Sequence, residues 1–297
     1  MEAYIDESGA KGFLRNLGST TDDDIALFAA IAVSGTRSDF RVACVDPFEK
    51  FKAARPAGAG QLHFTDAFAP GNEAWAAVAE GVRREVIALI GQHGVKVIYE
   101  ARRLGVARGT FEREQELRRR AAAAAAGRES PIVVNERSSS ERVEESCMGG
   151  LILKIECYCA DHGFGMVTMI ADQMDGRAEQ SFNRKIAEAR SVSGVDIPLS
   201  GWNRETGSRV ERVLKLTARD ALGRTLSELN ATHLGKLRVL GKTDPLVFVA
   251  DVVANSLHDH LLQLPPGAPL NAPSSVASWE LGNQVYGNRD DAFEDVV

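Results

Sequence analysis

Residues 2–9 are Glu-Ala-Tyr-Ile-Asp-Glu-Ser-Gly, in which the apolar residues 3–5 are followed by four polar or small residues. The apolar residues 3–5 predict a short β-strand, and the polar residues 6–9 predict a turn that ends it. A second strand is predicted at 25–34, where nearly every residue is apolar and several are β-branched. The polar residues between these two segments predict a long hairpin or loop.

Strands and helices alternate along the rest of the chain. Further strands are predicted at 95–99, 165–171 and 236–240, and helices at 40–54, 73–92, 110–126, 138–162, 177–191 and 244–262. The last of these helices has the clearest start, because Asp244 suits the N-cap and Pro245 suits the first helical position. This order of elements predicts an α/β layer fold with one central sheet.

Length and composition indicate a folded protein with one main domain. The 297 residues are 44% hydrophobic and 26% charged, which excludes wholesale disorder and a fibrous repeat. We expect a domain over 1–263 with a helical, arginine-rich insertion at about 101–135, followed by a Pro-rich linker and acidic tail at 264–297. The sequence shows no membrane span, signal peptide, disulfide framework or zinc motif. A cytoplasmic protein without a membrane partner is therefore expected, and its oligomeric state is left open.

Charge is unevenly distributed along the chain. The net charge is −6, yet residues 101–128 hold eight arginines and three glutamates (8 − 3 = +5), and residues 204–224 hold six basic and three acidic residues (6 − 3 = +3). Such asymmetry is typical of a basic surface that meets a polyanion. The candidate nucleic-acid contacts are Arg113, Arg118, Arg119 and Arg120. The alternative is that these segments only present charged faces to solvent.

Acidic residues fall where predicted strands end. Asp6 follows the first strand, Asp172 follows the strand at 165–171, and Asp251 lies beside the apolar stripe of the last helix, near the rim of the sheet. Open α/β sheets place their sites at strand ends. Carboxylates gathered there repel one another unless a hard cation such as Mg²⁺ or Mn²⁺ bridges them. We therefore predict Asp6, Asp172 and Asp251 as metal ligands, although each could serve only as a turn or cap residue.

Two further residues are catalytic candidates. Glu7 joins Asp6 only if the chain has already turned, because side chains alternate between the two faces of a continuing strand. His63 could transfer a proton or orient a ligand near neutral pH. Repulsion among the acids in the absence of metal also predicts that Asp251→Asn stabilises the metal-free protein.

Four short motifs occur in a recognisable order. They are Tyr4-Ile5-Asp6-Glu7-Ser8-Gly9, Leu62-His63-Phe64-Thr65-Asp66, Met169-Ile170-Ala171-Asp172, and Gly241-Lys242 followed by Ala250-Asp251. Together they resemble the motifs of the bacterial domain-of-unknown-function family 3800. Gly241 stands where that family has serine, and Phe248 stands where it has glutamine. The resemblance implies a ribonuclease H-like central mixed sheet flanked by helices, with metal-dependent nuclease chemistry.

The expected function is a metal-dependent phosphodiesterase of the two-metal-ion type that acts on nucleic acid, DNA or RNA. Two alternatives stay open. One is a non-catalytic module that binds nucleic acid or another partner and retains the fold, and the other is hydrolysis of a nucleotide or small phosphoester. Convergence of the three aspartates would weigh against the binding module. Basic segments on the same side as those aspartates would favour a polymer over a nucleotide.

Overall fold

The computed structural model describes residues 1–11, 21–35, 38–58, 62–126, 132–134, 143–172, 176–191, 195–216, 233–241 and 243–286. The predicted α/β fold with a central sheet is confirmed, and the sheet has five strands in the order β3-β2-β1-β5-β8. These strands are β1 (Glu2–Gly9), β2 (Ile25–Val33), β3 (Lys96–Arg103), β5 (Val167–Ala171) and β8 (Leu234–Val239). The β1–β2 and β2–β3 pairs are antiparallel, whereas β1–β5 and β5–β8 are parallel, so the sheet is mixed.

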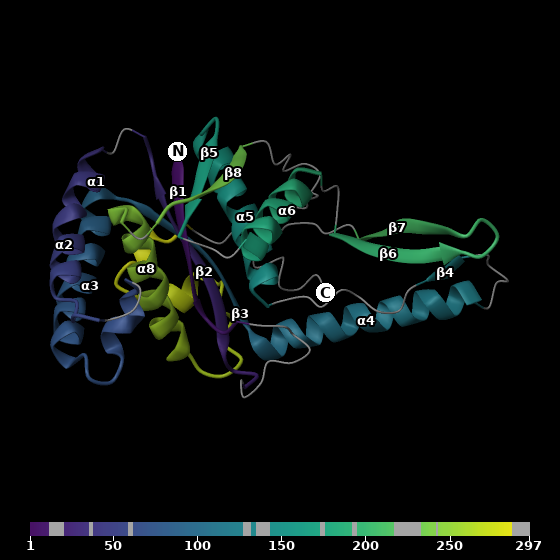
Figure 1. Ribbon diagram of the computed structural model, residues 1–297, viewed down its shortest axis with the longest axis horizontal. Helices are drawn as coiled ribbons and strands as arrows, with labels where there is room; N and C mark the ends of the chain where they lie inside the picture. The colour runs from purple at the N-terminus through teal and green to yellow at the C-terminus, as the bar shows by residue number, and fades with distance from the viewer. Residues whose placement is uncertain are drawn as a thin grey trace.

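Helices cover both faces of this sheet (Figure 1). One face carries α1 (Ser38–Ala43), α2 (Val45–Ala53), the 3₁₀-helix η1 (Phe64–Phe68), α3 (Glu73–His93) and α8 (Pro245–Leu262), and the other carries α5 (Val143–His162) and α6 (Gly176–Ser191). Side chains alternate along β1. Tyr4 therefore joins the core on the α8 side, and Ala3 and Ile5 join the core on the α5 side.

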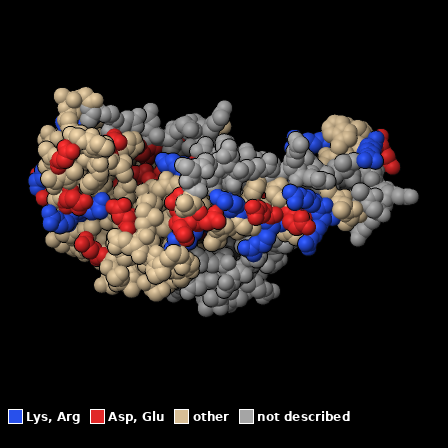
Figure 2. Space-filling model, turned by 90° about the horizontal axis from the view of Figure 1, so that it is seen from below, with Lys and Arg blue, Asp and Glu red and all other residues tan. Residues whose placement is uncertain are grey.

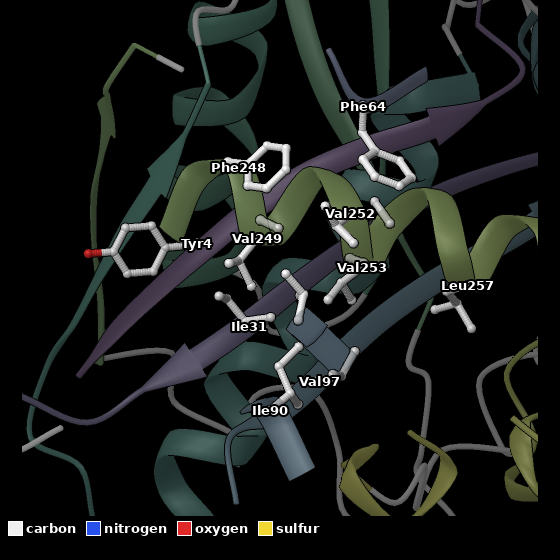
Figure 3. Packing of buried hydrophobic residues seen from close by; sticks show 14 of the residues in the cluster. Tyr4, Ile31, Phe64, Ile90, Val97, Phe248, Val249, Val252, Val253 and Leu257 are labelled. Carbon is white, nitrogen blue, oxygen red and sulfur yellow. The ribbon is translucent and has the colours of Figure 1, made fainter. Parts of the chain in front are cut away.

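The helix α8 is enclosed on nearly all sides. Residues 246–257 are all buried. Val253 points toward the sheet strands (Figure 3), whereas the Phe248 ring packs 4.8 Å from the Phe51 ring of α2. A helix that is apolar all round belongs inside a protein, so the prediction that Asp251 lies at the rim is wrong: Asp251 is 3% exposed. Neither α8 nor any other described helix is long and apolar enough to cross a membrane.

The first strand is longer than predicted. The polar half of the opening motif continues β1 instead of turning, because it stays paired with β2 from Asp6 opposite Ala29 to Gly9 opposite Ala26. Gly9 ends the strand with a φ of 85°, a conformation that favours glycine. The motif is thus carried by a regular strand in the middle of the sheet.

Most other predicted elements are present with shifted ends. The helix predicted at 40–54 is two helices, α1 and α2, which part at Cys44. The strand predicted at 95–99 extends to Arg103, and the helix predicted at 110–126 begins at Leu104 as α4 (Leu104–Ala126). The predicted helix residues 138–142 lie outside the described residues, as does Lys242 of the fourth motif.

An arm projects from the main body (Figure 1). It consists of α4 and a second sheet, β4 (Ile132–Val134), β6 (Val195–Asn203) and β7 (Ser208–Leu216), in the order β4-β6-β7. The α4 helix packs on β4, which pairs with the end of β6. The predicted helical insertion is therefore one half of this arm, and the β6–β7 hairpin that completes it was not predicted.

The segment after α8 packs more closely than a linker. Leu270, Val276 and Trp279 belong to the core on the α8 side, and the segment forms two short 3₁₀-helices, η2 (Pro273–Val276) and η3 (Gly282–Gln284). The Asn271 amide exchanges two hydrogen bonds with the backbone of Ala101 on β3. Residues 264–286 therefore cover the outer strand of the sheet, which would otherwise offer unpaired backbone groups. The predicted acidic tail at 287–297 lies outside the described residues.

Candidate functional site

The parallel pairing of β1 with β5 brings Asp6 and Asp172 to neighbouring positions. Tyr4 lies opposite Ile170, and each aspartate comes two residues later on its own chain segment. Tyr4 and Ile170 both belong to the core on the α8 side, and the alternation of side chains directs the aspartates to that same side. Both aspartates are half-buried. The structure thus joins two of the predicted site residues on adjacent strands, Asp6 within β1 and Asp172 just after the end of β5.

Asp251, Asn255 and His258 form a polar stripe along α8, which lies beside the second half of β1. Ser8 Oγ on β1 donates a hydrogen bond to Asn255 Oδ1 on α8 at 3.1 Å, a link that the sequence analysis did not predict. Asp251 lies one helical turn before Asn255, and α8 runs in the same direction as β1 (Figure 3). Four helical residues rise about 6 Å, which is roughly two strand residues. Asp251 is therefore level with Asp6.

Both carboxylate oxygens of Asp251 accept hydrogen bonds from the protein. Oδ2 accepts the backbone N–H of Phe64 at 2.9 Å, and Oδ1 accepts the Asn255 side-chain amide at 2.6 Å. These bonds meet the requirement that a buried polar group be paired. Within the described residues, no group of three or more His, Cys, Asp or Glu side chains is arranged to hold a metal ion. The predicted three-aspartate centre is thus reduced to the Asp6–Asp172 pair, with Asp251 turned toward η1.

The histidine motif reaches this region through η1. His63 is the N-cap residue of η1 and is half-buried. The next residue, Phe64, donates its backbone N–H to Asp251. The motif at Leu62–Asp66 and the motif that ends at Asp251 therefore meet in space, as a shared site requires.

Gly241 and Phe248, the two positions that depart from the motifs of the resemblance suggested by the sequence, have different surroundings. Phe248 is buried, and its ring lies 4.8 Å from Phe51 and 6.3 Å from Phe64. An apolar contact at Phe248 therefore holds η1 against α8. Gly241 is exposed at the start of the turn before α8.

Glu7 faces the opposite side of the sheet from Asp6. It lies opposite Phe28 of β2, whose side chain belongs to the core on the α5 side. Its carboxylate pairs with Lys11 Nζ at 2.5 Å. Because β1 continues past Glu7 without turning, the condition under which Glu7 joins Asp6 is not met.

His258 closes the far end of the polar stripe. It is half-buried, and burial lowers the pKa of its imidazole from the ordinary value of 6.5. Its ring lies so close to Gly9 that a Cβ at that position would clash with the ring and with the Ile25 carbonyl oxygen. The glycine of the opening motif is therefore required by close packing as well as by its positive φ.

The four candidate arginines of α4 have two kinds of surroundings. Three of them are exposed, namely Arg113, Arg119 and Arg120. Arg118 is 6% exposed and pairs with Glu114 at 2.5 Å, so it belongs to the interior of the arm and is unsuited to phosphate contact. The exposed arginines share the helix surface with acidic residues, and Arg120 pairs with Glu116 at 3.0 Å. Figure 2 shows both basic and acidic side chains on the arm.

No family model, no curated protein and no solved structure matches this chain. Three features of the structure bear on its function: the Asp6–Asp172 pair, the polar stripe of α8, and the arm.

Proposed function

We propose that the protein is a divalent-metal-dependent phosphodiesterase that cleaves nucleic acid on a ribonuclease H-like scaffold. The observation that carries this proposal is that Asp6 and Asp172 follow paired residues of two parallel strands, Ile5 and Ala171. Alternation from Tyr4 and Ile170, which join the core on the α8 side, directs both aspartates to that side of the sheet. A mixed sheet with its first strand at the centre and helices on both faces supports the scaffold.

The aspartate pair suits Mg²⁺ or Mn²⁺. Mg²⁺ commonly binds one or two carboxylates and completes its octahedron with waters and substrate phosphate oxygens. Asp6 and Asp172 would hold the cation from adjacent strands, and when bound it would activate a water and stabilise the leaving oxygen. A two-metal-ion form needs ligands beyond this pair. Asp251 could supply one only through an oxygen that already accepts a hydrogen bond from Phe64 or Asn255.

In this proposal Asp251 is a positioning residue. Its carboxylate holds the backbone of η1 through Phe64 and the amide of Asn255, and Asn255 in turn accepts the Ser8 hydroxyl. This chain of hydrogen bonds connects η1, α8 and β1, so it holds the strand that carries Asp6. His63, at the start of η1, is the candidate acid or base, because histidine is the side chain that most often serves as a general acid or base.

Cleavage of labelled single- and double-stranded DNA and RNA tests the proposal. We expect cleavage with Mg²⁺ or Mn²⁺ and none in EDTA. Asp172→Asn keeps the side-chain shape but removes the charge that a hard cation needs, so activity should fall at least roughly 100-fold. Asp259→Asn, an exposed change on α8, is the matched control and should keep full activity. Equal cleavage in EDTA, or full activity in a folded Asp172→Asn variant, would overturn the proposal.

A second candidate function is a nucleic-acid-binding module that retains the fold without catalysis. The hydrogen bonding of both Asp251 oxygens favours it, since the described residues then offer two neighbouring carboxylates instead of three. Binding of nucleic acid without cleavage in either metal would select this alternative.

A further inference from the structure

The distal end of the arm exposes an indole ring. Trp202, near the end of β6, is 53% exposed, whereas the other two tryptophans of the sequence, Trp75 and Trp279, are 1% and 7% exposed. The pairing of β6 with β7 places Trp202 directly opposite Arg209. Directly opposite residues lie on one face with Cβ atoms about 5 Å apart. The exposed Arg209 therefore flanks the exposed indole.

This pairing of an aromatic ring with guanidinium groups has a known binding chemistry. A second exposed arginine, Arg204, begins the turn that follows Trp202 on the hairpin. Nucleobases stack on exposed aromatic rings whatever their sequence, and guanidinium groups bind the phosphates between them. A single exposed tryptophan is ordinary on a protein surface. An indole with one arginine directly opposite and another two residues along the chain, at the end of a projecting hairpin, can offer both contacts.

The charge of the arm differs in sign from the rest of the chain. Residues 104–126, 132–134 and 195–216 hold nine basic and six acidic residues (9 − 6 = +3). Because the whole chain has a net charge of −6, the remainder carries −9 (−6 − 3 = −9). The described arm is therefore a part of the chain whose net charge favours contact with a polyanion.

We propose that the end of the arm, at Trp202, Arg204 and Arg209, binds single-stranded nucleic acid. A base stacks on the indole, and the two guanidinium groups contact the neighbouring phosphates. A single strand is favoured over a duplex because paired bases are stacked on one another and do not offer their faces. This inference rests on the proposed function in that the substrate is nucleic acid, but it concerns binding and does not require cleavage.

Tryptophan fluorescence tests the proposal directly, because Trp202 is the one exposed tryptophan of three. The full-length protein is titrated in EDTA with oligo-dT, oligo-U and a DNA duplex of equal length. Both single strands should quench the emission, and the duplex should bind more weakly. Labelled-oligonucleotide anisotropy should then show roughly tenfold weaker binding for Trp202→Ala, with most of the affinity kept by Trp202→Phe. Met166→Ala, at an exposed apolar residue of the main body, is the control and should bind like wild type.

The outcomes separate this proposal from the proposed function. Unchanged affinity in a folded Trp202→Ala variant, or equal affinity for duplex and single strand, would overturn the arm proposal while metal-dependent cleavage could still be measured. Single-strand quenching that depends on Trp202, with no cleavage in Mg²⁺ or Mn²⁺, would support the arm proposal and overturn the nuclease. An absence of any nucleic-acid binding by the wild type would overturn both.

Discussion

The helices α8 and α4 both carry residues that the sequence singles out, but their surroundings differ. α8 is buried on nearly all sides, and Asp251 within it is held by a backbone N–H and a side-chain amide. α4 projects in the arm, and its exposed Arg120 pairs with Glu116 of its own helix. A buried carboxylate must find protein donors, whereas an exposed charge is solvated and gains little from an ion pair. The buried charge of Asp251 on α8 therefore has a structural role, whereas the exposed charge of Arg120 on α4 lies at the surface.

Asp251→Asn is the change with the largest expected effect on stability. An amide has one acceptor oxygen and would turn an NH₂ group toward the Phe64 N–H or the Asn255 amide, leaving a buried donor unpaired. We expect the free energy of unfolding to fall by about 2 kcal/mol, measured by urea denaturation in EDTA. The structure thus reverses the sequence-based expectation that this variant is more stable.

Asp259→Asn is the matched control on the same helix. Asp259 is exposed and pairs with Arg83 at 3.0 Å, so its loss should change stability by less than about 1 kcal/mol. If Asp251→Asn were instead at least as stable as wild type in EDTA, repulsion from the Asp6–Asp172 pair would dominate, and Asp251 would belong to the acidic centre after all.

Arg118 and Arg120 provide the corresponding test on α4. Arg118→Met removes a buried charge from its pair with Glu114 and should cost about 1 kcal/mol of stability. Arg120→Met should cost less than about 0.5 kcal/mol but should flatten the salt dependence of oligonucleotide binding, by roughly 0.7 in the log–log slope if Arg120 contacts one phosphate. Urea denaturation and salt titrations check the two expectations. A larger binding defect for Arg118→Met than for Arg120→Met would contradict this division.

The smallest expected effect is a pH dependence from His258. Burial lowers the pKa of this imidazole below its ordinary value of 6.5, so at acidic pH the unfolded chain binds a proton that the folded chain resists. Stability from this group is therefore lost as the pH falls below about 6.5. Urea denaturation should show a smaller loss of stability between pH 7.5 and 5.5 for His258→Asn than for wild type. An identical pH dependence in the two proteins would show that His258 does not contribute.

Local signals in the sequence predict much of the fold. The start of α8 was predicted from Asp244 and Pro245, and the Asp244 side chain does accept the Leu246 N–H. The continuation of β1 past Asp6 was not predicted, since polar residues before a glycine favour a turn when their strand partner is unknown. The pairing with β2 outweighs that preference.

The candidate site was predicted only in part. Asp6 and Asp172 are neighbours because β1 and β5 pair in parallel and each aspartate follows a paired residue, Ile5 and Ala171, although β1 continues past Asp6. The role of Asp251 was missed because one apolar stripe was assigned to α8, although Phe248 and Val252 make its opposite side apolar as well. The β6–β7 hairpin was missed because Pro198 and Gly201 interrupt the strand pattern.

Titration calorimetry of Mn²⁺ binding tests the account most directly. It is applied to wild type, Asp6→Asn, Asp172→Asn and Asp251→Asn at a temperature where each protein is folded. The account predicts that Asp6→Asn and Asp172→Asn weaken Mn²⁺ binding at least roughly tenfold without loss of stability. Asp251→Asn should lose stability and keep Mn²⁺ affinity within a few-fold of wild type. Undiminished Mn²⁺ binding in both Asp6→Asn and Asp172→Asn, or binding abolished in folded Asp251→Asn alone, would contradict the assignment of the metal to the Asp6–Asp172 pair.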